Sequence, residues 1–168
     1  MPIGRPLARP EDAALLRGEG RYTDDLNEPG QAYACVVRSP HAHGRIRAIG
    51  ILEALALPGV LAVYTAGDLA GYGLHKCLAP LPGLKVPARR ALAQDRVRFV
   101  GDPVACVVAG SAQQAKDAAE AVRLDIEPLP AVALASEAAQ PGAAQLYDEV
   151  PGNVAVDYRY GDAIAQNP

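Results

Sequence analysis

The stretch Arg98–Val122, RFVGDPVACVVAGSAQQAKDAAEAV, decides the fold of this 168-residue chain. Val104–Ala109 is an unbroken apolar run, short enough to be a strand that is buried on both faces. Gly101-Asp102-Pro103 before it is typical of a turn. We therefore expect Val97–Val100 to be a strand that lies beside this one.

A helix is expected directly after the apolar strand. Ser111 can open it because a serine hydroxyl can accept a hydrogen bond from the amide three residues on. The Gln114 side chain can reach back to complete a capping box. Leu124–Glu127 is expected to be the next strand, so that the helix covers one side of the sheet. Small residues on one helical face let it lie close to that sheet: Ala112, Ala115, Ala119 and Val122.

Outward from this unit, apolar or alternating runs between turn residues predict further short elements. The expected strands are Gln31–Arg38, Arg45–Ile49, Val60–Thr65 and Val154–Tyr160. One or two helical turns are expected at Glu11–Leu16 and two at Ile51–Leu57, and a short helix is expected at Leu134–Ala139. The sequence thus predicts an α+β fold, a mixed sheet of six or seven short strands covered by two or three helices.

The length suits a single domain over residues 1–168, large enough to bury a core. Within it, residues 1–30 are rich in Gly, Pro and charge and are expected to form an N-terminal arm. Residues 67–90 are rich in Gly and Pro and are expected to form a long ordered loop.

Composition narrows the class of protein. Half of the residues are apolar, but with one Phe and no Trp the core must consist mainly of Ala, Val, Leu and Ile. The 16 basic and 19 acidic side chains give a net charge of −3, which offers no electrostatic case for binding nucleic acid.

The sequence also bears on where the chain resides. Its first residues lack a charged stretch followed by an apolar run, so no secretory signal is predicted, and no apolar run is long enough to span a bilayer. The three cysteines are widely spaced without a Cys-x-x-Cys pair, which favours free thiols in a reducing compartment. A cytoplasmic location is therefore expected.

The segment His41-Ala-His43 is the most ligand-like part of the chain. Two residues apart on an extended strand, both imidazoles would face the same way and could share a metal, with a third ligand from His75 or Cys77. The alternative is a pair of hydrogen-bonding histidines at the start of a strand. We favour a polar, partner-facing edge formed by four residues: Arg38, Ser39, His41 and His43.

The cysteines and the turn aspartate offer weaker candidates for chemistry. Cys106 lies inside the apolar strand, where a thiol usually behaves as a small buried hydrophobe. Cys77 follows His75-Lys76 in the expected loop 67–90, where positive charge could favour the thiolate. Asp102 before Pro103 is expected to cap amides of its own turn. No catalytic, cofactor-binding or metal-binding residue is predicted from these patterns.

A set of segments in a fixed order runs through the whole chain. The segments are Ile3–Pro6, Arg9–Asp12, Leu15–Gly20, Arg21–Asp25, Pro29-Gly30, Val37–His43, Arg45-Ile46, Ala56–Val60, Ala62-Val63, Val97–Ala105, Val107–Ala109, Ala118-Ala119, Glu127–Val132, Pro151–Asn153 and Gly161-Asp162. Taken together, this set resembles the N-terminal α/β-hammerhead domain of the large subunit of molybdenum hydroxylases, which include aldehyde oxidases, xanthine dehydrogenases and aerobic carbon monoxide dehydrogenases. The bacterial members with separate large, medium and small subunits look most similar.

The resemblance implies an oxidoreductase whose active site lies outside these residues. Large subunits of the family continue for several hundred residues, and those later domains hold molybdopterin cytosine dinucleotide. Electrons then pass through iron–sulfur clusters and often FAD, on a small and a medium subunit. This domain would brace the molybdenum-binding domains and contact the iron–sulfur subunit. Departures from the family pattern are modest: Gly44, Gly50 and Cys106 replace the alanine, aspartate and small apolar residue that are common there.

Three interpretations follow from the sequence. The first is a structural and subunit-interaction domain of such a hydroxylase, with no turnover of its own and an exposed apolar patch where the other domains dock. The second is a free-standing binding module that kept the hammerhead fold without the enzyme. The third is an independent enzyme or metal protein that uses His41, His43 and Cys77.

Overall fold

The computed structural model describes residues 4, 6–7, 9–75 and 77–161 of the chain. The chain divides into two compact units, residues 1–31 and residues 32–168. The boundary lies one residue beyond the expected arm of residues 1–30, while the single domain over the whole chain stays a prediction.

The first unit holds one α-helix and one turn of 3₁₀ helix. The helix α1 (Asp12–Leu16) forms where the sequence predicts it. The 3₁₀ helix η1 (Thr23–Asp25) forms because the Asp25 carboxylate accepts a hydrogen bond from the Tyr22 amide at 2.8 Å and closes the turn.

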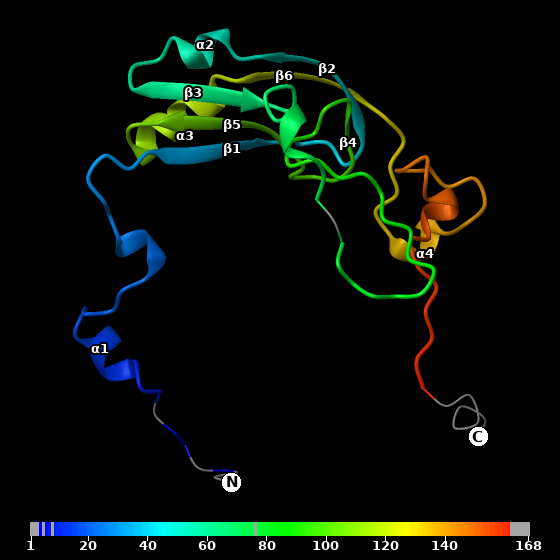
Figure 1. Ribbon diagram of the computed structural model, residues 1–168, viewed down its shortest axis with the longest axis horizontal. Helices are drawn as coiled ribbons and strands as arrows, with labels where there is room; N and C mark the ends of the chain where they lie inside the picture. The colour runs from blue at the N-terminus through cyan, green and yellow to red at the C-terminus, as the bar shows by residue number, and fades with distance from the viewer. Residues whose placement is uncertain (1–3, 5, 8, 76, 162–168) are drawn as a thin grey trace. The chain divides into compact units, whose positions relative to one another are not determined.

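The second unit contains six strands in two separate antiparallel sheets (Figure 1). In the first sheet, β5 (Pro103–Ala109) lies between β1 (Tyr33–Arg38) and β3 (Val60–Thr65). The second sheet has β2 (Gly44–Gly50) between β4 (Arg96–Val97) and β6 (Arg123–Pro128). The α+β class is confirmed, but the single mixed sheet is wrong, because every pairing is antiparallel and the strands divide into two groups.

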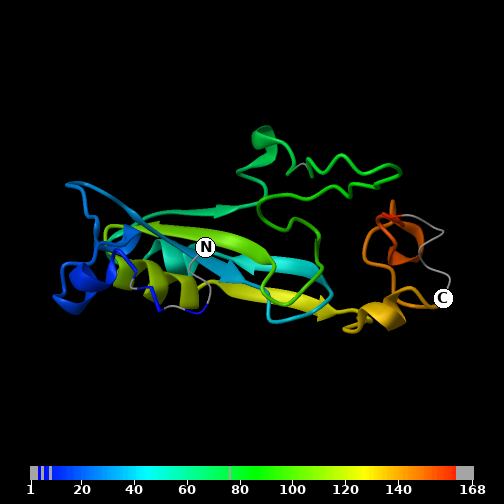
Figure 2. The same cartoon turned by 90° about the horizontal axis from the view of Figure 1, so that it is seen from below.

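The helix α3 (Ala112–Glu120) covers one face of the first sheet and contacts all three of its strands (Figure 2). Ser111 caps it as expected, accepting a hydrogen bond from the Gln114 amide at 3.2 Å. The Gln114 side chain accepts the Ser111 hydroxyl proton at 3.1 Å instead of reaching the backbone amide of the cap. Ala115 and Ala118 are the buried positions, whereas Ala112 is exposed.

A core of small and branched residues fills the space between this helix and the sheet. The short helix α2 (Leu52–Leu55) packs against β3 and α3 and contributes Ala54. The absence of large aromatic residues in this core fits the composition, since alanines on α3 let helix and sheet approach closely. The fully packed members are Ala54, Val63, Ala105, Val107, Ala118 and Val122.

The second sheet has a smaller core of its own, formed by Val97, Val104 and Ile126. Val104 stands at the start of β5, so this strand contributes to both cores. The expected strand Val97–Val100 is shorter than predicted. It ends at Val97 because the chain then turns toward β5, and it pairs with β2 instead of lying beside β5.

The remaining segments carry little regular structure. The described residues of the expected loop 67–90 form the 3₁₀ turn η2 (Ala70–Tyr72) and an isolated bridge between His75 and Arg89. Beyond β6 come the helix α4 (Ala135–Ala138) and the 3₁₀ turn η3 (Pro151–Asn153). The expected strand Val154–Tyr160 is wrong, since this segment pairs with no strand in the structure.

One asparagine orders this C-terminal part. Asn153 has a left-handed backbone (φ 57°), and its side-chain amide donates to the carbonyls of Ala138 and Ala144, at 2.9 Å each. Its Oδ1 accepts from the Leu146 amide at 3.0 Å. A single side chain thereby fastens three points of the segment that follows α4.

No helix in the described ranges combines the length and apolarity needed to cross a bilayer.

Candidate functional site

The expected partner-facing segment begins where β1 ends, and its backbone is tied to the turn before β5. The Ser39 amide donates to the Asp102 carbonyl at 2.9 Å, and the Gly101 amide donates to the Ser39 carbonyl at 2.8 Å. Arg38 adds a hydrogen bond from its guanidinium to the Gly101 carbonyl at 2.9 Å. These bonds hold the segment in one place on the sheet.

The Ser39 side chain is buried and bonds to the backbone of its own segment. It is 2% exposed, accepts from the His41 amide and donates to the His41 carbonyl, both at 3.0 Å. Its hydroxyl is thus used up in shaping the turn. Arg38 is exposed and His41 is half-buried, so these two side chains are the ones that a partner could reach.

Asp102 caps its turn as the sequence predicts. Its carboxylate accepts a hydrogen bond from the Arg98 amide at 2.9 Å. Burial raises the pKa of this carboxyl group, against the opposing effects of the Arg98 amide and of the charges on Arg89 and Arg98. The Asp102 carboxyl group therefore stabilises the turn through this hydrogen bond, and its burial away from water disfavours its ionised form.

His43 is an internal residue. Its side chain is 6% exposed, and Nδ1 lies 2.8 Å from the Pro130 carbonyl oxygen. Because a carbonyl only accepts, Nδ1 must carry the proton in this contact. The other ring nitrogen, Nε2, is buried without a hydrogen-bond partner in the described structure. His43 therefore links the start of β2 to the segment after β6.

The metal hypothesis needs a third ligand beside His41 and His43. Among the residues described, no group of three or more His, Cys, Asp or Glu side chains is arranged to hold a metal ion. His75 is instead in the loop bridge to Arg89. The pair thus lacks the ligand set that a protein zinc site requires.

The cysteines are all free. Burial, with a smaller contribution from Cys35, raises the pKa of the Cys106 thiol, as expected for a thiol inside a strand. Cys77 is exposed. The expected effect of Lys76 on it falls on a residue outside the described part of the chain.

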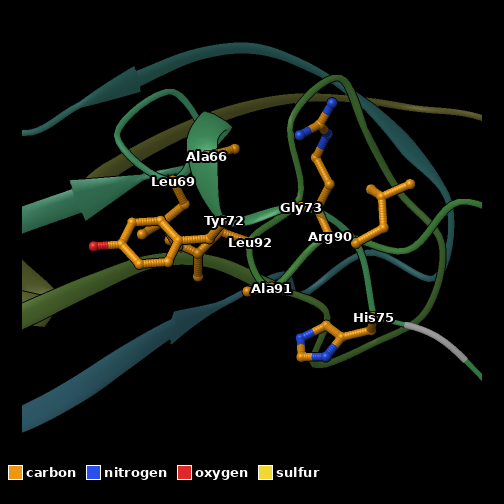
Figure 3. Close-up of a pocket in the computed structure, with 9 residues that line it drawn as sticks. Ala66, Leu69, Tyr72, Gly73, His75, Arg90, Ala91 and Leu92 are labelled. Carbon is orange, nitrogen blue, oxygen red and sulfur yellow. The ribbon is translucent and has the colours of Figure 1, made fainter.

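The surface has two hollows that were not predicted from the sequence, although His75 and Asp102 at their linings were named there for other reasons. The first, of about 140 Å³, is formed mainly by η2 and the segment 90–92 (Figure 3). His75 and Arg90 extend in different directions and do not converge on one point. A hollow of this size is small for an organic substrate. It is lined by Ala66, Leu69, Tyr72, Gly73, Leu74, His75, Arg90, Ala91 and Leu92.

The second hollow, of about 400 Å³, is lined by four arginines and three carboxylates among other residues. Arg98 lies over the ring of Tyr147 at 4.6 Å and donates to the carbonyls of Leu146 and Arg96. Arg89 lies over Phe99 at 5.4 Å. Arg98 thus holds segment 146–149 against the turn, and Arg96 lies 3.8 Å from the Asp148 carboxylate. Three of the four arginines that line this hollow are therefore engaged within the protein.

The order of these elements can be compared with that in known proteins. The family model described as "Aldehyde oxidase and xanthine dehydrogenase, a/b hammerhead domain" matches residues 17–130, which include all six strands. The chain belongs to this family. The hammerhead domain that the sequence resembles is thereby confirmed.

Curated members of the aldehyde oxidase and xanthine dehydrogenase family are similar over most of this chain. The carbon monoxide dehydrogenase large chain of Afipia carboxidovorans is 41% identical over 148 residues, 88% of this chain and 18% of its own length. The nicotine 6-hydroxylase large subunit of Paenarthrobacter nicotinovorans is 40% identical over 164 residues, 95% of this chain and 20% of its own. The chain thus spans about a fifth of the length of these relatives.

Solved structures of the family share the fold. Quinoline 2-oxidoreductase from Pseudomonas putida 86 superposes with a TM-score of 0.80 at 39% identity, over 89% of this chain and 19% of that one. A Cu,Mo-CO dehydrogenase in its carbon monoxide reduced state superposes with a TM-score of 0.69 at 39% identity, over 84% of this chain and 17% of that one.

Membership of this family raises the question of the molybdenum cofactor, which the residues described do not fit. The Ser39 hydroxyl is bonded to the His41 backbone and His43 Nδ1 to the Pro130 carbonyl, which leaves His43 Nε2 as the one unpartnered buried side-chain nitrogen or oxygen among the described residues. A single such atom cannot hold a molybdopterin cofactor. In the larger hollow, Arg89 and Arg98 lie over aromatic rings, and Arg98 also donates to the Leu146 carbonyl. No step of a hydroxylase reaction can therefore be derived from the side chains of this domain.

Proposed function

We propose that this chain is the structural and subunit-interaction domain of a molybdopterin-dependent hydroxylase or dehydrogenase of the xanthine dehydrogenase, aldehyde oxidase and carbon monoxide dehydrogenase type. One observation carries this: the chain matches the hammerhead domain and spans about a fifth of the large subunits to which it is similar. The molybdenum active site then lies in residues outside this chain.

The rest of the complex is inferred from the same relatives. The words "large chain" and "large subunit" in their names favour partners of smaller size, and the Cu,Mo-CO dehydrogenase favours molybdenum. We expect molybdopterin cytosine dinucleotide on the remaining domains of the large subunit, iron–sulfur clusters on a small subunit and FAD on a medium subunit. A bacterial source and a cytoplasmic location belong to the same proposal.

Within this assembly, the edge formed by Arg38, Ser39, His41 and His43 is proposed to face a partner. The exposed side chain of Arg38 and the half-buried ring of His41 would make the contact. The buried side chains of Ser39 and His43 would support it from within, through their hydrogen bonds to His41 and Pro130.

The test is to isolate the affinity-tagged chain, with whatever polypeptide it is continuous with or bound to, from its native cells. Molybdenum, iron and FAD are then measured per chain. We expect molybdenum in a near one-to-one ratio, together with iron and flavin. A tagged chain that carries none of them would instead indicate a free-standing binding module with the hammerhead fold.

A further inference from the structure

The face of the β1–β5–β3 sheet opposite α3 is crossed by two rows of side chains. Residues paired across neighbouring strands project to the same side of a sheet. The register pairs Val36 and Tyr64 with Cys106, and it pairs Ala34 and Ala62 with Val108. We call these six residues the open face.

The open face has the composition of a buried surface. Its members are uncharged, and the central strand reads Val104–Ala109, a continuous apolar run of the kind found in strands covered on both sides. Among the described residues of the second unit, α3 covers one side of this sheet, and the other side is left partly exposed. Val107, which points toward α3, is fully buried, whereas Val36 is 36% and Tyr64 42% exposed.

A groove deepens the open face near the start of β5. Its volume is about 320 Å³, and Leu69 and Leu92 form its wall beyond the sheet. Arg38 is the charged residue among those that line it, and its guanidinium is already bonded to the Gly101 carbonyl. An apolar centre with a single charge at its margin is typical of a permanent interface, where charged residues are depleted.

We propose that the open face packs against the molybdenum-binding domains of the large subunit. This rests on the proposed function. The relatives' chains extend beyond the matched part by about four fifths of their length, so in those proteins a large polypeptide accompanies the matched domain in every copy. A surface of this apolarity needs a partner that is always present, which favours that polypeptide over a subunit that joins later.

The first test places charge on the face in the assembled enzyme. Val36→Glu and Tyr64→Glu are each compared with Leu52→Glu, which changes a side chain that is 80% exposed on α2, on the opposite side of the sheet. The molybdenum content per purified chain is the readout. We expect about a ten-fold loss for the two face variants, as for charged substitutions at an interface centre, and no change for the control.

The second test does not depend on how well the charged variants fold. A photo-crosslinking amino acid replaces Tyr64 in the whole enzyme, and the crosslinked peptides are identified by mass spectrometry. Crosslinks to the molybdenum-binding domains support the proposal. Crosslinks only to a second copy of this chain, only to the iron–sulfur or flavin subunit, or to no protein at all would overturn it.

The two proposals can fail separately. If the unaltered chain carries no molybdenum, the proposed function is wrong. If it carries molybdenum, and Tyr64→Glu retains it while position 64 crosslinks elsewhere, only the assignment of the open face is wrong.

Discussion

The Nδ1 atom of His43 lies 2.8 Å from the carbonyl oxygen of Pro130, and this hydrogen bond joins two segments 87 residues apart in the sequence. A histidine in a motif that looks like a binding site is thus part of the domain's interior. The contact gives a direct way to separate a structural role from an interaction role.

Replacing His43 by Ala is expected to lower the free energy of unfolding by roughly 1–3 kcal/mol, because it removes the hydrogen bond to the Pro130 carbonyl and opens a cavity where a side chain only 6% exposed had been. His41→Ala is the control. The structure uses His41 through its backbone, so its loss should stay within about 0.5 kcal/mol. Urea denaturation of both variants checks this, and equal, small effects would show that His43 is not structural.

Ser111→Ala is expected to destabilise the domain by about 1 kcal/mol, because the hydroxyl that accepts from the Gln114 amide is lost at the start of α3. Ser111→Thr keeps a hydroxyl in this place and should retain most of the stability. Thermal unfolding followed by circular dichroism measures both. A threonine variant as unstable as the alanine variant would point to packing rather than capping.

Gly59→Ala is expected to be costly for two reasons that can be measured apart. Gly59 has φ of 82°, and a side chain there would also meet the Gln114 side chain. Gly101 has φ of 90° with open space around its Cα, so Gly101→Ala measures the left-handed strain alone, about 1–2 kcal/mol. Gly59→Ala should cost more than this.

The added cost at position 59 should disappear when Gln114→Ala is also present, which a double-mutant cycle in urea denaturation detects. A cost at position 59 that is unchanged in the Gln114→Ala background would contradict the steric contact.

Asp102→Asn is expected to stabilise the domain at pH 7. Burial raises the pKa of Asp102 above its ordinary 3.8, so stability is lost as the pH rises through the folded-state pKa and the group ionises. Asparagine cannot ionise, yet its carbonyl can still accept from the Arg98 amide. The difference between the two proteins should therefore shrink toward pH 3.8. A variant that is less stable at pH 7 would mean that attraction to Arg89 and Arg98 outweighs burial.

Asn153→Ala is expected to cost about 1 kcal/mol for each of three lost hydrogen bonds, with added strain at φ of 57°. Asn153→Gly loses the same bonds without the strain, so it should be the less damaging change by about 1 kcal/mol. Limited proteolysis should cut both variants faster than the unaltered chain within residues 138–147. Equal resistance of all three proteins would exclude the fastening role of Asn153.

Local signals in the sequence predict the elements that depend on neighbouring residues. The strand Val60–Thr65 is found with the bounds expected, and Ser111 caps α3 as expected. Both depend on side chains and turns within a few residues. The resemblance of ordered segments to the hammerhead domain, which needs the whole chain, was also confirmed.

The local sequence patterns could not predict which strands pair with each other across long stretches of the chain. Leu124–Glu127 follows α3 directly, yet β6 joins β2 in the other sheet, and nothing in its own sequence names that partner. Val154–Tyr160 alternates like a strand and finds no partner in the structure. His43 looks like a ligand in sequence because its acceptor, Pro130, becomes its neighbour only after β2 and β6 pair.

Because β5 lies between β1 and β3, the first sheet can form only after the ribosome has made β5. Tyr33 pairs with Ala109, and Gly50 pairs with Arg123, so β1, β2 and β3 leave the ribosome long before β5 and β6. Closing such long loops before any contact forms makes folding slow. A growing chain that has reached only the turn before Pro103 already holds β2 and its partner β4, but β1 and β3 still lack their partner β5. It is in this interval that a chaperone would be needed to prevent aggregation.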